Sequence, residues 1–396
     1  MLSKKALAVS PSPTLAIDGK AKEMIRQGLD VIGFGAGEPD FDTPLHIKEA
    51  AIKAIHEGHT RYTPASGTIE LKEAVCYRIK TDQGLEYSPD QIVISNGAKH
   101  SLFNALAALL NPGDEVLIPV PYWVSNPELV KLNDGVPVAV ETRRDNCLKA
   151  TVEDLEKYRT TRTKVLLLNS PTNPTGQVYS AEEMKALADY CCEHNLYVIG
   201  DEIYEKLTYD NARHYSIASF NDKIKELTIV INGLSKSYAM TGWRIGYTAS
   251  TTEIARVMNT IQGQMTSGPN SIAQRAAVTA LQGSQECVEE MRLAFDQRRR
   301  HMCEQVNNIP CLEALVPRGT FYLFIDVSGA LGRSYEGQKI ENGDDFARHL
   351  LESKKVAIVP GSGFGAPNYV RMSFATSMEH IAEGLQRMEA FVNELV

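Results

Sequence analysis

The stretch KVLLLNSPTNPTGQVYSAEEMKALADYCCEHNLYVIGDEIY, residues 164–204, contains a strand, a helix and a second strand in succession. Both KVLLLN and LYVIG are continuous apolar runs, whereas residues 181–195 repeat apolar side chains at helical spacing. A continuous run, unlike an alternating one, indicates a strand that is buried on both faces, as in parallel sheets covered by helices. The pattern recurs along the chain, with strands expected at 91–97, 115–123 and 227–236 and a helix at 101–110. The fold class is therefore predicted to be α/β, with a mostly parallel sheet.

A second, smaller region follows the large one. A helix is expected from QRRRHMCEQV (297–306), followed by GTFYLFIDV (319–327), KVAIVPGSGFG (355–365) and YVRMSFA (369–375). This order is typical of an α+β domain, and a chain of 396 residues is long enough for two cores. The predicted division is an N-terminal arm with part of the small domain at 1–45, a large domain at 46–292 and a small C-terminal domain at 293–396.

The composition of the chain argues against nucleic acids and membranes as partners. The net charge is -8, and an acidic chain lacks the basic face that nucleic acids require. The chain has no apolar run near the roughly 20 residues that span a bilayer. Pro11 and Pro13 interrupt the apolar start, which argues against a secretory signal. The seven cysteines form no CxxC pair, which indicates a reducing compartment. We therefore predict a cytoplasmic protein without nucleic-acid or membrane partners.

Polar clusters follow five of the expected strands. Because the carboxyl ends of parallel strands meet at one edge of the sheet, these clusters are expected to lie together at a ligand site. They are SNGAKH (95–100), PYW (121–123), NSPTNPTG (169–176), GDEIY (200–204) and NGLSKS (232–237).

Two of these clusters offer hydrogen-bond donors. In SNGAKH, the N–H groups of Gly97, Ala98 and Lys99 at a helix start would point toward an anion, although an ordinary strand-to-helix turn has the same sequence. In NSPTNPTG, proline steps fix the position of Asn173, whose amide would donate into a cleft. The alternative is that this loop is merely rigid.

Charged residues follow two central strands. Asp201 ends a buried strand, where a carboxylate is costly unless it meets a cation or a proton donor, and Tyr204 lies within reach. A helix N-cap is the alternative for Asp201. Lys236 has small, apolar and aromatic neighbours and Arg244 close by, which would make its amine nucleophilic; a solvated surface lysine is the alternative. Taken jointly, a lysine, an acid and a cluster of phosphate donors are what pyridoxal phosphate requires.

With these motifs in this order, the chain closely resembles the class I aminotransferases of the fold-type I pyridoxal-phosphate enzymes, and among them the bacterial aspartate and aspartate/prephenate branch. The resemblance runs nearly end to end and also includes PSPTLAI (11–17), GAGEPDFDTP (35–44), RYTPASG (61–67) and SKSYAMTGWRIGY (235–247). It implies a large domain with a seven-stranded type of sheet, a homodimer with shared active sites, and pyridoxal 5′-phosphate as cofactor. The implied reaction is ping-pong transfer of an amino group from aspartate or glutamate to a 2-oxo acid such as 2-oxoglutarate.

The resemblance also implies catalytic roles. Lys236 would bond the cofactor's aldehyde and carry the proton between the substrate α-carbon and the cofactor's C4′. Asp201 would keep the ring nitrogen protonated, and Tyr204 and Asn173 would hydrogen-bond the ring oxygen. Trp123 would stack on the ring, with Ile203 on the opposite face.

Phosphate and substrate contacts are implied in the same way. Gly97, Ala98, Lys99 and Arg244 would line the phosphate end, and Tyr62 would reach the phosphate of the neighbouring subunit. The substrate would meet Arg371 through its α-carboxylate, with Gly37, Trp123 and Asn173 nearby, and a distal carboxylate would meet Lys99 and Thr14.

One departure from the family pattern concerns a hydroxyl. Many relatives have a phosphate-binding serine three residues before the lysine, where this chain has Gly233; Ser235 is not assigned that role. Four alternatives remain open: an enzyme for aromatic amino acids in which Lys99 only caps local structure, a prephenate aminotransferase, a carbon–sulfur lyase on the same fold, and a non-catalytic regulator. The acidic charge and the absence of an added basic domain argue against the regulator.

Overall fold

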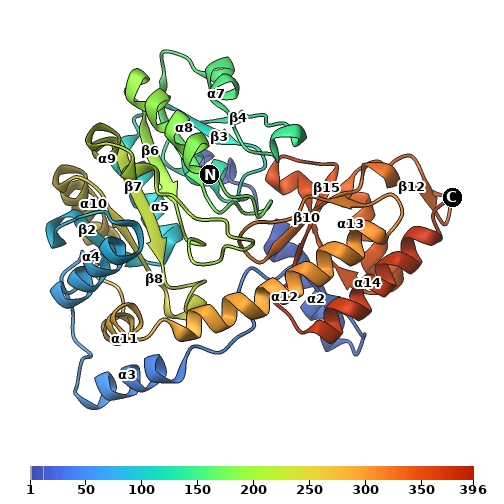
Figure 1. The fold of residues 1–396 in the computed structure, drawn as a ribbon, viewed down its shortest axis with the longest axis horizontal. Helices are drawn as coiled ribbons and strands as arrows, with labels where there is room; N and C mark the ends of the chain where they lie inside the picture. The colour runs from blue at the N-terminus through green and yellow to red at the C-terminus, as the bar shows by residue number, and fades with distance from the viewer. Residues whose placement is uncertain (1, 12) are drawn as a thin grey trace.

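The large domain is built around a seven-stranded sheet (Figure 1). The computed structural model describes residues 2–11 and 13–396. In sheet order the strands are β2 (Ile92–Asn96), β8 (Ile245–Ala249), β7 (Thr228–Gly233), β6 (Tyr197–Asp201), β5 (Thr163–Asn169), β3 (Glu115–Pro119) and β4 (Val136–Val140). All the pairings are parallel except those of β8, which runs antiparallel to both of its neighbours. The predicted mostly parallel α/β fold is confirmed.

Both faces of this sheet are apolar, which explains the continuous apolar runs in the sequence. In β7, Ile229 and Ile231 pack with α5 and α10, whereas Val230 between them packs on the opposite side with α4 and α11. The covering helices are α3 (Leu45–His56), α4 (Ile69–Gln83), α5 (Ala98–Leu109), α6 (Asn126–Leu132), α7 (Val152–Tyr158), α8 (Ala181–His194), α9 (Asp222–Leu227), α10 (Thr252–Met265) and α11 (Ser271–Gln282).

The helix predicted at 181–195 is α8. It begins after Ser180, whose side chain accepts from the Glu183 N–H while Glu183 reaches back to the Ser180 N–H, a capping box. It ends at Asn195 in the left-handed conformation, with φ 54°. Two strands of the large sheet, β4 and β8, were not predicted from the sequence.

The small domain contains an antiparallel sheet of order β14 (Val359–Pro360), β15 (Tyr369–Ser373), β10 (Tyr322–Asp326) and β9 (Glu313–Ala314). Its helices are α12 (Glu286–Asn308), α13 (Gly343–Lys354) and α14 (Met378–Asn393). Helix α2 (Pro13–Arg26) joins it, since Ala21 packs with Leu351 and Ala357. The remaining elements are α1 (Lys4–Leu7), β1 (Ile32–Gly33), which pairs in parallel with β13 (Val356–Ala357), and the hairpin of β11 (Ser334–Tyr335) and β12 (Gln338–Lys339).

Helix α12 connects the two parts of the molecule (Figure 1). It begins earlier than the predicted helix, so the proposed division between residues 292 and 293 falls inside it. Val288 packs into a core cluster of the large domain, whereas Phe295 and Met302 pack into the core around β10 and β15. No helix of the described residues is long and apolar enough to cross a membrane.

Candidate active site

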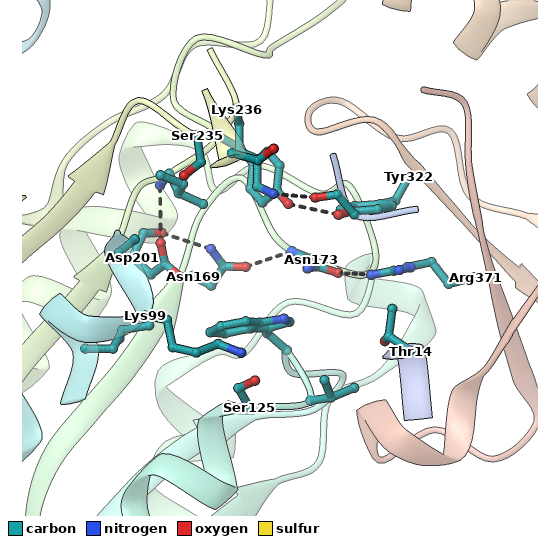
Figure 2. Close-up of a pocket in the computed structure, with 18 of the residues that line it drawn as sticks. Thr14, Lys99, Ser125, Asn169, Asn173, Asp201, Ser235, Lys236, Tyr322 and Arg371 are labelled. Atoms are coloured by element: carbon teal, nitrogen blue, oxygen red, sulfur yellow. Dashed lines mark hydrogen bonds between the residues drawn. The ribbon is translucent and has the colours of Figure 1, made fainter. Parts of the chain in front are cut away.

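A cavity lies where the carboxyl edge of the large sheet faces the small domain (Figure 2). Five strand ends of the large domain contribute to it, as predicted from the polar clusters, and β10, β15 and the N-terminal segment close it from the other side. Its polar and aromatic lining consists of Thr14, Lys99, Trp123, Ser125, Asn169, Asn173, Asp201, Tyr204, Ser235, Lys236, Thr241, Arg244, Tyr322 and Arg371, with Gly37, Ala98 and Ile203 between them. Every predicted site residue except Gly97 and Tyr62 therefore lines this one cavity.

Lys236 lies in the connection between β7 and β8, and its Nζ donates to the Gly37 carbonyl. Burial lowers the pKa of this amine to about 8, and the nearby Arg371 and Arg244 act in the same direction. A lysine of this kind is partly neutral near physiological pH and can act as a nucleophile or a base. The structure therefore does not support the alternative of a solvated surface lysine.

Asp201 is the last residue of β6, and only 5% of it is exposed. Within the described residues, its carboxylate accepts one hydrogen bond, from the Ile203 N–H at 3.2 Å. The cap-like bond considered from the sequence is thus present, but it leaves the carboxylate with unused acceptor capacity inside the cavity. Burial raises the pKa of Asp201 to about 7, which is expected for a desolvated acid without a cation in contact.

Tyr204 and Tyr322 form a hydroxyl pair at the cavity wall, with 3.0 Å between their oxygens. Burial raises the pKa of both phenols, so both keep their protons. Tyr322 was not predicted as a site residue, because it lies in an apolar stretch that is typical of a core strand. Its hydroxyl lies so close to Gly37 that a Cβ there would be 3.3 Å away.

Arg371 carries a buried positive charge, and only 1% of the residue is exposed. Its guanidinium lies 4.1 Å from the Tyr322 ring centroid, and it donates to Asn173 Oδ1 at 3.0 Å and to the Gly35 carbonyl at 3.1 Å. Its Nε is buried and has no hydrogen-bond partner in the part of the chain that the structure describes. No carboxylate of the described residues pairs with this arginine, so the cavity holds an uncompensated cation suited to a carboxylate ligand.

Lys99 provides a second cation. It lies in the first turn of α5, with Nζ 4.7 Å from the Trp123 ring centroid. Burial and then the charge of Arg244 lower its pKa. No ion pair or hydrogen bond joins the Lys99 amine to an acid among the described residues. Among the described residues, no hydrogen bond of the Lys99 amine supports the alternative that this lysine only caps local structure.

Arg244 and the start of α5 form the anion-binding end of the cavity. Arg244 donates to the carbonyls of Thr241 at 2.7 Å and Asn96 at 3.3 Å. Gly97 has a φ of 82°, and a Cβ there would lie 2.1 Å from Arg244 Nη2. Glycine at this position therefore lets the guanidinium approach the N-terminus of α5, where backbone N–H groups and the helix dipole favour an anion.

The hydroxyl missing at position 233 has a steric explanation. Gly233 ends β7, and a Cβ there would lie 2.8 Å from the Ile245 carbonyl oxygen and 3.0 Å from Gly246 Cα. Backbone packing against β8 thus excludes a serine. Ser235 lines the cavity beside Lys236.

Tyr62 lies away from this cavity. Its surface is 98% exposed, and it borders a separate groove lined by Thr60, Arg61 and residues 268–271. Within one chain it does not reach Lys236. Its contact with a neighbouring subunit stays a prediction.

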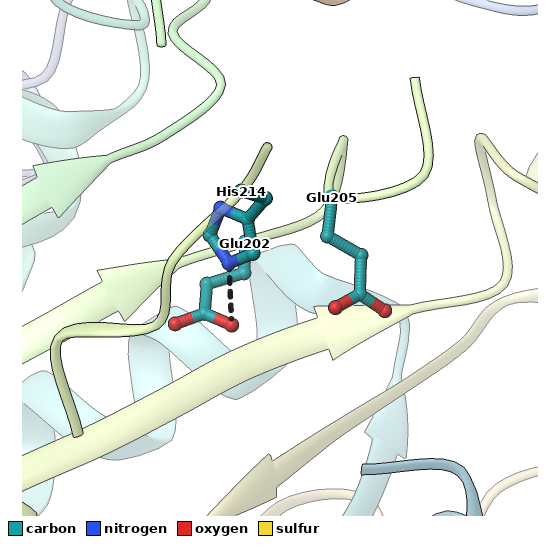
Figure 3. A group of neighbouring side chains, drawn as sticks. All are labelled: Glu202, Glu205 and His214. Carbon is teal, nitrogen blue, oxygen red and sulfur yellow. Dashed lines mark ion pairs between the residues drawn. The ribbon is translucent and has the colours of Figure 1, made fainter. Parts of the chain in front are cut away.

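A buried polar cluster supports the turn that follows Asp201 (Figure 3). His214 Nε2 lies 3.0 Å from a Glu202 carboxylate oxygen, and Gln83 Nε2 lies 2.8 Å from Glu202 and 2.5 Å from Glu205. These residues do not line the cavity. They connect residues 202–205 to the end of α4 and so hold the segment that carries Asp201 and Tyr204.

Several known proteins are similar to this chain in sequence and fold. The aspartate aminotransferase of Geobacillus stearothermophilus is 49% identical over 99% of this chain and 98% of its own, and the probable aspartate/prephenate aminotransferase of Aquifex aeolicus is 44% identical over 100% and 99%. The crystal structure of the Rhizobium meliloti aspartate aminotransferase has a TM-score of 0.97 and 41% identity, and covers 100% of both chains. The model of the family described as aminotransferase class I and II matches residues 29–388. This chain belongs to the class I and II aminotransferase family.

Proposed function

We propose that the protein is a pyridoxal-phosphate-dependent transaminase that moves the amino group of aspartate or glutamate to a 2-oxo acid such as 2-oxoglutarate. The observation that carries this proposal is the pair of uncompensated cations, Arg371 and Lys99, in the cavity that contains Lys236. A dicarboxylic substrate would neutralise both cations at once. The named relatives act on aspartate or on aspartate and prephenate according to their names, which supports the same substrate class.

The cavity fits pyridoxal phosphate. Asp201 is a buried carboxylate with one N–H partner, and a protonated ring nitrogen would supply the missing positive charge. At the other end, Gly97, Ala98, Ser235 and Arg244 would hold the phosphate. When bound, the cofactor supplies a ring that accepts electrons from the substrate's α-carbon.

Side chains between these two ends would orient the ring. Tyr204 and Asn173 would donate to the ring oxygen, while Trp123 and Ile203 would contact its two faces; all four line the cavity. Tyr322 can donate to the Tyr204 oxygen, which leaves the Tyr204 proton free to point into the cavity.

The chain's own groups account for binding and proton movement. Arg371 would bind the α-carboxylate, because its fork has an unused edge, and Lys99 with Thr14 would bind the distal carboxylate. Lys236 would remove the proton from the α-carbon of the donor and, in the second half-reaction, protonate the α-carbon of the acceptor, because an amine with a pKa of about 8 exists in both protonation states near neutral pH. One cavity would serve donor and acceptor in turn, as a ping-pong reaction requires.

The active form is proposed to be a homodimer. Apolar side chains are exposed on the two helices that flank Tyr62 in the sequence, namely Leu45, Ile52 and Ile55 on α3 and Ile69 at the start of α4. Such a surface is typical of a protein interface. The same interface would place Tyr62 at the phosphate of the partner subunit. The proposed location is the cytoplasm, and the absence of a disulfide among the seven cysteines is consistent with it.

A half-reaction panel tests the function. The holoenzyme is mixed with single amino acids, and the absorption band of the bound cofactor is followed as its aldehyde form becomes the amine form. Fast conversion with aspartate or glutamate and slow conversion with phenylalanine are expected; the reverse order would refute the dicarboxylate assignment. Adding prephenate or 2-oxoglutarate to the amine form then identifies the acceptor. Release of pyruvate and ammonia from cystathionine without an oxo acid would instead indicate a lyase.

A further inference from the structure

Asn169 lies at the centre of a hydrogen-bond chain that crosses the cavity (Figure 2). It is the last residue of β5 and is paired in register with Asp201 of β6. Its Nδ2 donates to the Asp201 carbonyl at 3.0 Å, and its Oδ1 accepts from the Asn173 N–H at 2.7 Å. Asn173 Oδ1 in turn accepts from Arg371 Nη1 at 3.0 Å. The chain thereby connects three strands, β5, β6 and β15, through the turn that carries Asn173.

The chemistry of its partners gives Asn169 a single orientation. A carbonyl must meet the NH2 group and an N–H must meet the oxygen, so rotation of the amide by half a turn would break both bonds. The Thr172 hydroxyl donates to the Asn169 carbonyl at 2.8 Å and fixes the same turn from its other side. Neither aspartate nor a shorter polar side chain reproduces both contacts.

We infer that Asn169 is a positioning residue that holds Asn173, and through it Arg371, in register with Asp201. The inference rests on the proposed function, in which Arg371 binds the substrate carboxylate. The Asp201 carbonyl has a second donor, the Ser170 N–H at 3.1 Å. The Asn173 N–H has no second acceptor among the described residues. Loss of the Asn169 side chain is therefore expected to alter the positions of Asn173 and Arg371 more than that of Asp201.

The experiment compares three variants of the holoenzyme. Asn169→Ala removes both side-chain bonds, whereas Asn169→Asp keeps an oxygen for the Asn173 N–H. Asn104→Ala is the matched control, because Asn104 is fully buried and donates to Gln262 at 2.9 Å outside the cavity. Calorimetry with succinate, a non-reacting dicarboxylate, reports on Arg371. Hydrogen exchange in a peptide that contains Asn173 reports on the turn without any ligand.

Asn169→Ala should weaken succinate binding about 2- to 10-fold, the range expected for one hydrogen bond between neutral groups, and should speed exchange at Asn173. Asn169→Asp should keep most of the succinate affinity and most of the protection from exchange at Asn173. Asn104→Ala should lower the melting temperature but leave succinate binding and exchange at Asn173 unchanged. Unaltered exchange in Asn169→Ala would overturn the inference, as would equal losses in the Asn104 control. Failure of the wild type to bind succinate would count against the proposed function instead, and the exchange measurement would still decide the role of Asn169.

Discussion

Replacing Lys99 with methionine tests how the protein selects its substrate. Methionine has a similar length and suits the space beside Trp123, but it has no charge. A hydrogen bond that involves a charged group contributes about 1.5–3 kcal/mol, which corresponds to about a 10- to 150-fold change in kcat/KM. The value for aspartate should fall by that factor. The value for phenylalanine should hold or rise, because a desolvated cation beside Arg244 has been removed.

Steady-state kinetics with aspartate and phenylalanine provide the measurement, and the ratio of the two kcat/KM values is the quantity to report. Lys99→Arg retains the charge and should keep that ratio within a few fold of the wild type. Equal losses for both substrates in Lys99→Met would mean that the lysine supports the cofactor end of the cavity. If the ratio of the two kcat/KM values is unchanged in Lys99→Met, Lys99 does not bind the second carboxylate of the substrate.

Three further changes test the site and its support. Lys236→Ala should slow the aspartate half-reaction by about 10³-fold or more in stopped-flow absorbance, and normal turnover would contradict its role. Gly233→Ser should lower the free energy of unfolding in urea by about 1–3 kcal/mol, because its Cβ would meet the β8 backbone; wild-type stability would show that the strands can separate. Burial acts to lower the pKa of His214, but Glu202 and Glu205 outweigh it and the pKa is raised. The interaction of protonated His214 with the two carboxylates therefore stabilises the fold below about pH 6.5. This contribution to the free energy of unfolding is lost as pH rises through the folded-state pKa of His214. The stability difference between wild type and His214→Gln should shrink at high pH, and a pH-independent difference would exclude this linkage.

Sequence patterns predicted five of the seven strands of the large sheet, β2, β3, β5, β6 and β7, because these strands are continuous apolar runs without polar alternation. They did not predict β4, an edge strand that leaves Val136 exposed, or β8, a short segment that directly follows Arg244 and contains a glycine and a threonine. Strand ends were recognised because glycine, proline and charged residues interrupt apolar runs there.

Tyr322 and Asn169 were missed for a different reason. Tyr322 reaches the cavity only because β10 packs against the segment that follows β6, which includes Ile203 and Leu207, and local sequence carries no information about that contact. Asn169 looks like an ordinary polar residue after a strand, and its importance depends on the distances to two backbone groups. The boundary inside α12 likewise has no marker in composition, since the helix continues through both cores.

The antiparallel direction of β8 has a consequence for how the chain can vary. Lys236 and Arg244 lie in one connection, residues 234–244, and the pairing of Gly233 with Gly246 closes it at its base. The number of residues in this connection therefore sets the separation of the two cations. Lengthening it by a single residue would displace one cation relative to the other and misfit a ligand that must touch both. Insertions in this connection are therefore expected to be tolerated less well than substitutions at those of its positions that do not line the cavity.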